Sequence, residues 1–201
     1  MIIIPEKPAS RVDVPRLIDF GGFLTPAGGG PVQRLNRLGN RYAVTVTMPP
    51  MRGSQARIFV NRLIRGKSEG ARMAWPLDGF DPGAPLVGGA PVVVDGSGQA
   101  GRQLSIRSIA PHYAFREGQP ISLEVDGQHY FDFIAQATVV GAGGTATITL
   151  SQMLRIEPPD GAVLHVAKPM IEGFIVGSEI SWEQAISGFT EGIQFEIQEA
   201  R

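Results

Sequence analysis

The chain has 201 residues, which is enough for one large or two small domains with a buried core. It contains 26 glycines and 16 prolines but only 7% aromatic residues, a composition that favours many short strands joined by turns. A net charge of -1 excludes the basic footprint of duplex nucleic-acid binding, and the lack of cysteine excludes disulfides, thiolate metal sites and a cysteine nucleophile.

The first 31 residues predict two strands and a loop. Three isoleucines at residues 2–4 indicate a short strand that ends at Pro5, and residues 12–20 contain a second strand candidate. Residues 25–31 are too rich in glycine and proline for a strand or helix, so they predict a loop or an arm. The start lacks the basic region of a signal peptide, and no stretch approaches the about 18 apolar residues of a membrane span. We therefore expect a soluble, unexported chain without a membrane partner.

The clearest pattern is a strand followed by a helix. Apolar residues alternate with alanine and threonine over residues 42–48, which predicts a strand with one face on a core. Apolar residues then recur at helical spacing, which predicts a helix over residues 54–65 that begins at an N-cap, Ser54, and ends at Gly66. The only other helical signal is a weak turn at residues 182–186.

A chain with many strands and one good helix must use that helix to cover a sheet. Phe59 and Leu63 lie on the apolar face of the predicted helix. We therefore expect both side chains in the core.

The second half of the chain changes character after residues 78–89, which read as a linker rich in glycine and proline. The Asp126-Gly127 pair predicts a two-residue hairpin turn, because a type I′ turn requires positive φ at both positions. The spacing of the strand candidates favours a small antiparallel barrel or sandwich. The candidates are residues 91–94, 103–108, 121–125, 128–135, 146–150 and 163–167.

The last strand candidates, residues 174–182 and 193–199, need a sheet to join. We expect the final strand to return to the sheet that contains residues 42–48. This predicts a mainly β fold with a first β-sandwich domain, formed by residues 1–89 plus 169–201 and carrying the helix. Residues 90–168 are then an inserted small β-barrel domain that folds autonomously.

Two glycine-rich motifs resemble catalytic or cofactor signatures. Residues 96–101 match the dinucleotide-binding pattern GxGxxG, but a strand-like pattern follows where that site needs a helix, so we expect no cofactor. Residues 66–70 match the GxSxG nucleophile elbow around Ser68, but they follow a helix instead of preceding one. Asp126, Asp132 and His165 are nominal triad partners of the kind that any chain of this size offers.

The remaining candidate side chains lie around the predicted hairpin. His112, His129 and His165 have no metal-ligand spacing such as HExxH, so we expect no metal site and a surface or half-buried position for His129. Glu124, Asp126 and Asp132 leave a paired-carboxylate glycosidase open, although charges beside a hairpin are usually solvated. Aromatic residues there, of which we single out Tyr130, offer stacking to a sugar, although such residues are more often core.

Four segments together resemble proteins of the tail modules of long-tailed bacteriophages and prophages. They are RLGNRYAVTVTMPPM at residues 37–51, PVVVDGSGQAGRQL at 91–104, GQPISLEVDG at 118–127, and MLR at 153–155 with PDGA at 159–162. The chain resembles most closely the distal tail protein, a ring between the tail tube and the tail-tip hub. The resemblance covers about residues 35–170, and none of its motifs is catalytic.

The resemblance implies a tail-tube-like β domain with one helix that carries an OB-like or galectin-like second domain, here inserted instead of C-terminal. It also implies a virion structural protein, made in the host cytoplasm, that assembles as a hexameric ring, contacts the tube and hub proteins, and lets DNA pass without binding it. We expect no enzyme activity. For the oligomer interface we single out Ile2, Ile3 and Ile4, as exposed apolar strand residues.

Two functions from other classes remain open at this stage. The first is a carbohydrate-binding module of the adsorption apparatus that uses Tyr130. The second is an enzyme, most plausibly a hydrolase.

Overall fold

The computed structural model describes residues 1–200, and within them the protein is mainly β with a single helix. The main sheet is formed in the spatial order β1 (Ile2–Ile3), β7 (Ala71–Ala74), β16 (Met170–Val176), β19 (Gln194–Glu199), β5 (Arg41–Thr47) and β2 (Val12–Ile18). Its pairings are antiparallel except for β1 with β7, which is parallel. The predicted return of the last strand to the sheet of residues 42–48 is confirmed, because β19 pairs with β5.

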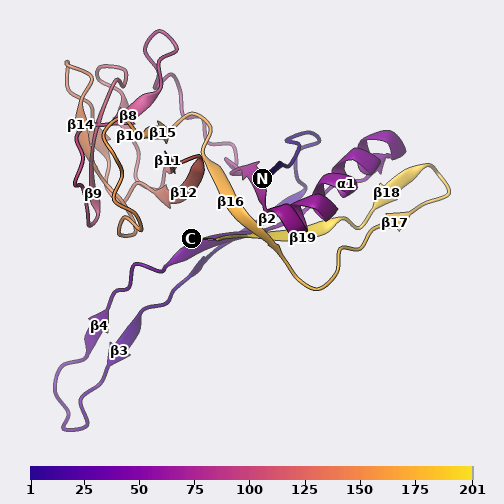
Figure 1. Ribbon diagram of the computed structural model, residues 1–201, viewed down its shortest axis with the longest axis horizontal. Helices are drawn as coiled ribbons and strands as arrows, with labels where there is room; N and C mark the ends of the chain where they lie inside the picture. Colours follow the sequence, from indigo (N-terminus) through magenta and orange to yellow (C-terminus); the bar gives the residue numbers. More distant parts are fainter. Residues whose placement is uncertain (201) are drawn as a thin grey trace.

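Helix α1 (Gly53–Glu69) covers one face of this sheet, as Figure 1 shows. Phe59 and Leu63 are buried in the core between helix and sheet, as predicted from their spacing. Within residues 1–200 no helix is both long and apolar enough to cross a membrane.

The predicted ends of the helix are wrong. The residue before α1 is Arg52, which makes no side-chain capping bond. The helix continues through Gly66 to Glu69, and the next residue, Gly70, has φ of 79°. A Cβ on Gly66 would lie 3.0 Å from Ile175 Cδ1 and 3.1 Å from the Ala71 Cβ. Gly66 therefore fits a close approach of helix to sheet instead of a left-handed cap.

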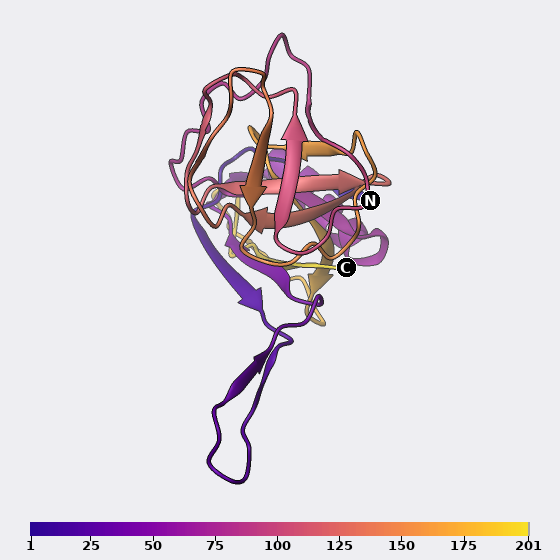
Figure 2. The same cartoon turned by 90° about the vertical axis from the view of Figure 1, so that its left-hand side faces the viewer.

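The second sheet is built from the predicted strands of residues 91–167. Residues 133–135 and 149–151 are joined by backbone hydrogen bonds and by the Ile134–Leu150 bridge, so the first and last strands meet and the sheet closes on itself, as Figure 2 shows from its side. Asp126 and Gly127 have φ of 52° and 76°, which confirms the hairpin turn. The spatial order is β12 (Gln128–Phe133), β11 (Pro120–Val125), β15 (Val163–His165), β8 (Val92–Val94), β9 (Gln103–Arg107) and β14 (Ala146–Thr149).

Several short strands complete the fold. In the second half, β10 (Ala114–Phe115) pairs with β13 (Thr138–Val139). Beside α1, β17 (Glu183–Gln184), β18 (Phe189–Glu191) and β6 (Met51–Arg52) form a small sheet, so the helical turn predicted at residues 182–186 is wrong. The strands β3 (Gly22–Leu24) and β4 (Gln33–Leu35) form a hairpin that extends away from both sheets (Figures 1 and 2), which we call the arm, residues 19–39. The loop or arm predicted at residues 25–31 is its tip.

The barrel and the main sheet share a contact that is both apolar and ionic. Phe131 of β12 belongs to the core of the main sheet, where its ring stacks on Trp75 at a centroid distance of 3.9 Å. Beside it, the buried Glu199 of β19 binds Arg155. Each part also has its own core cluster, with the second cluster formed by residues 92–166. The predicted domain boundaries near residues 90 and 168, and autonomous folding of the insertion, stay predictions.

Candidate functional site

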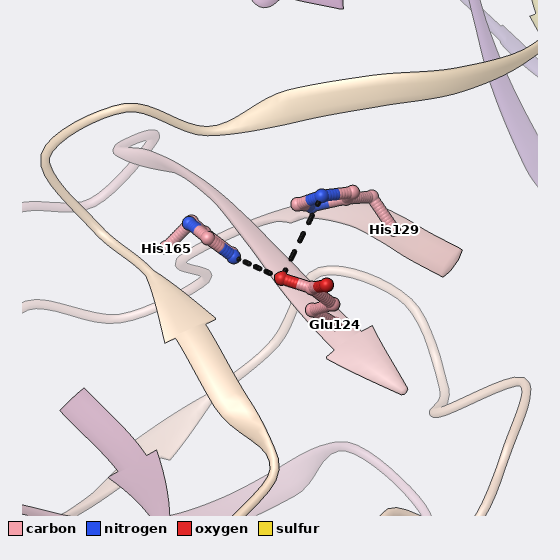
Figure 3. Close-up of side chains that lie close together, drawn as sticks. All are labelled: Glu124, His129 and His165. Carbon is pink, nitrogen blue, oxygen red and sulfur yellow. Dashed lines mark hydrogen bonds and ion pairs between the residues drawn. The ribbon is translucent and has the colours of Figure 1, made fainter. Parts of the chain in front are cut away.

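Three potential metal ligands meet on one face of the barrel sheet, as Figure 3 shows. The hairpin turn sets the first pair, because its register places Glu124 of β11 opposite His129 of β12. The third residue, His165, lies on β15, which pairs with the other edge of β11. Glu124 Oε2 lies 2.7 Å from His165 Nε2 and 3.8 Å from His129 Nε2. We call these three residues the Glu-His-His cluster.

The two histidines of the cluster differ in their surroundings. His129 is only 3% exposed, so the expectation of a surface or half-buried position is wrong. Desolvation lowers the pKa of His129 to about 4, and the positive charge of Arg72 acts in the same direction. Its ring is therefore neutral at pH 7. The hydrogen bond from His165 lowers the pKa of Glu124, so this carboxyl group is ionised.

Ser122, His129 and Glu124 contact one another in the serine-histidine-carboxylate order of a catalytic triad. Ser122 Oγ lies 3.3 Å from His129 Nδ1, and Glu124 lies beyond the other ring nitrogen. However, Ser122 is fully buried, and its Oγ accepts a hydrogen bond from the backbone N–H of Met170. A nucleophile must come within about 3 Å of a substrate atom, and a hydroxyl in this position cannot. The serine therefore holds the histidine in place.

The other predicted catalytic candidates do not converge. Ser68 lies exposed in the last turn of α1, where its hydroxyl bonds to the carbonyl of Arg65. Asp132 is buried and accepts a hydrogen bond from Tyr42, whereas His165 bonds to Glu124. The glycine-rich residues 96–101 lead into the strand β9, as expected, and not into a helix.

The residues predicted for an interface lie in different environments. Ile2 and Ile4 are buried in this chain, whereas Ile3 is 57% exposed. The expectation that all three are exposed is therefore wrong, because β1 pairs with β7 and adds alternate side chains to the core. Tyr130, the predicted glycan contact, is half-buried and packs against the barrel core, and the Arg155 guanidinium lies 5.5 Å from its ring centroid.

Large apolar side chains are exposed along the arm. Phe23, the middle residue of β3, is 67% exposed, and its ring is contacted by the guanidinium of Arg34. The other exposed apolar residues of the arm are Phe20, Leu24, Val32, Leu35 and Leu38. Folding leaves these side chains in water, so their apolar surface is available to another molecule.

The sequence contained a signal for two of the three residues of the Glu-His-His cluster. Once the Asp126-Gly127 turn is predicted, its register pairs residues 124 and 129 across the hairpin. The third member depends on the pairing of β11 with β15 across about 40 residues, which no local pattern predicts. No protein-family model matches this sequence, and a search of curated proteins finds no match either.

Proposed function

We propose that this chain is a structural component of a bacteriophage tail tip, which forms a ring between the tail tube and the hub and lets DNA pass. The single observation that carries this proposal is the arm, which extends away from both sheets and exposes large apolar side chains on both of its sides. These side chains are not buried within their own chain. The arm gains free energy only when a neighbouring subunit or tail protein covers it.

The main sheet supports the same proposal, because neither of its outer strands pairs with a further strand within residues 1–200. The order of strands places β1 at one edge and β2 at the other. A contact between unlike edges of successive subunits is heterologous, and such contacts generate closed rings when their rotation closes. A hexamer is the number that the resemblance implies.

The face of the main sheet opposite α1 has the composition that a DNA passage requires. It exposes Val14 and Phe174 beside threonine and glutamine side chains, and its charges include the ion pair between Arg16 and Glu196. In the proposed ring this face lines the lumen. A surface without excess positive charge lets the phosphate backbone pass without holding it.

The proposal assigns the chain no enzymatic reaction, and it ranks above the two alternatives for a structural reason in each case. A serine hydrolase would need an accessible nucleophile beside a base, whereas Ser122 is buried and the hydroxyl of the exposed Ser68 bonds to the carbonyl of Arg65. A sugar that stacks on Tyr130 would have to displace Arg155, which also binds Glu199.

The test is an assembly experiment with arm variants. Phe23→Ser and Leu35→Ser each remove an exposed apolar side chain, so the folded subunit should keep its stability while the ring is lost. Mass photometry and negative-stain imaging of the purified chain, alone and with the tube and hub proteins, measure assembly. Tail formation in a phage that lacks the wild-type copy measures function.

Val139→Ser is the matched control, because Val139 is equally exposed but lies on β13 of the barrel. It should assemble like the wild type. A wild-type chain that stays monomeric at high concentration with both tail partners present, or arm variants that still build tails, would refute the proposal.

A further inference from the structure

The Glu-His-His cluster joins three neighbouring strands of the barrel through side chains that are all capable of binding a metal. One ligand atom from each residue lies within 4.8 Å of the other two. We propose that Glu124, His129 and His165 form a zinc site. The site is independent of ring assembly, because all three residues belong to one chain.

The distances between the ligand atoms fit a zinc ion after small side-chain movements. Zinc bonds to nitrogen and oxygen are about 2.0 to 2.2 Å long, so tetrahedral ligand atoms lie about 3.3 Å from one another. The present separations from Glu124 Oε2, 2.7 Å to His165 and 3.8 Å to His129, lie on either side of that value. The side chains of Glu124 and His165 are about one-third exposed, so they are free to make the adjustment.

The buried histidine is positioned as a metal ligand should be. Ser122 Oγ contacts His129 Nδ1, which directs Nε2 toward Glu124, and Met170 N–H holds the serine from the other side. In metal sites, the histidine ring nitrogen that does not bind the metal almost always makes a hydrogen bond that fixes the orientation of the ring.

The nearest positive charge is already balanced. Arg72 pairs with the buried Glu172 and also donates a hydrogen bond to the carbonyl of Gly127. Its guanidinium is therefore held by one acceptor on the main sheet and one on the barrel hairpin, and the Glu124 carboxylate is left to the two histidines.

Two imidazoles and one carboxylate favour zinc over the harder cations. Calcium and magnesium prefer sites made only of oxygen ligands, whereas imidazole suits zinc and its first-row neighbours. A bound ion would connect β11, β12 and β15 on the side of the barrel that faces β16. It would therefore stiffen the barrel where it rests on the main sheet.

Zinc titration of the tag-free full chain tests the proposal. After dialysis against a chelator, isothermal titration calorimetry with zinc should show one ion per chain, while calcium and magnesium show no binding. His165→Ala and Glu124→Gln should each weaken zinc binding at least 10-fold. Both side chains are partly exposed, so the variants should fold, which circular dichroism verifies.

The matched control is His112→Asn, which removes the one histidine outside the cluster. His112 has φ of 61°, a conformation that asparagine tolerates well, so the backbone should be preserved. This variant should bind zinc like the wild type. No binding by the wild type, unchanged binding in both cluster variants, or loss of binding in His112→Asn would each overturn the proposal.

Discussion

The buried ion pair between the barrel and the main sheet predicts a large effect of a small substitution, Glu199→Gln. The Glu199 side chain is 1% exposed, and its carboxylate accepts hydrogen bonds from Arg155 and from the backbone N–H groups of Tyr42 and Phe131, all at 2.7 to 2.8 Å. An amide of the same size keeps one acceptor oxygen but turns an NH2 group toward donors, and it removes the charge that balances Arg155. Breaking a buried pair in this way costs about 3 to 5 kcal/mol. That is a large share of the about 5 to 15 kcal/mol by which domains are stable.

Urea unfolding at pH 7, followed by tryptophan fluorescence and circular dichroism, measures this loss. The matched control is Glu69→Gln, which breaks an exposed pair with Arg65 on α1 and should leave the free energy of unfolding almost unchanged. The double variant Glu199→Gln with Arg155→Met should be more stable than Glu199→Gln alone, because the unbalanced buried charge is gone. A single variant within about 1 kcal/mol of the wild type would show that this pair does not hold the two sheets together.

Three further predictions concern stability. Burial raises the pKa of Asp132 to about 6. The protonated carboxyl group therefore stabilises the folded protein fully below pH 3.8, and this contribution is lost as the pH rises through 6. The difference in the free energy of unfolding is about 3 kcal/mol. Asp132→Asn cannot ionise, so urea unfolding from pH 4 to 7 should show a flatter profile, and an unchanged slope would contradict the assignment. Gly173→Ala should lower the free energy of unfolding by about 3 kcal/mol or more, because its Cβ would lie 1.8 Å from the carbonyl oxygen of Gln198. Gly143→Ala has open space around its Cβ and should be tolerated in the same urea unfolding experiment. Residues 90–168 alone should fold with a β-type circular dichroism spectrum because they contain the barrel's own core cluster, and an unfolded fragment would show one continuous core.

Local patterns were sufficient where neighbours in sequence are also neighbours in space. The alternation over residues 42–48 and the helical spacing of Phe59 and Leu63 each report a single buried face, which the structure confirms. The error at Gly66 has a different origin. A glycine after a run of helical residues favours a cap, but here the main sheet approaches the helix so closely that a side chain would crowd Ile175.

Contacts between distant segments could not be predicted in the same way. The burial of Ile2 and Ile4 depends on a parallel pairing of β1 with β7, about 70 residues away. No local pattern indicates that Phe131 of the barrel packs on Trp75 in the core of the other sheet. The Glu-His-His cluster likewise needs β15 beside β11. Long-range strand order, and not residue type, limited these predictions.

The polar contacts between the two sheets determine how the barrel is oriented. Apolar packing of Phe131 against Trp75 is favourable over a range of angles, because the hydrophobic effect has no direction. The Glu199 carboxylate and the bond from the Tyr42 hydroxyl to Asp132 are satisfied in one orientation, and any rotation would leave buried donors or a buried charge without acceptors. In the proposed ring every subunit would therefore hold its barrel at the same angle to the main sheet. In a ring of six copies, the barrels would then be related by the rotational symmetry of the ring. A hub or adsorption protein could bind such an arrangement through repeated equivalent contacts.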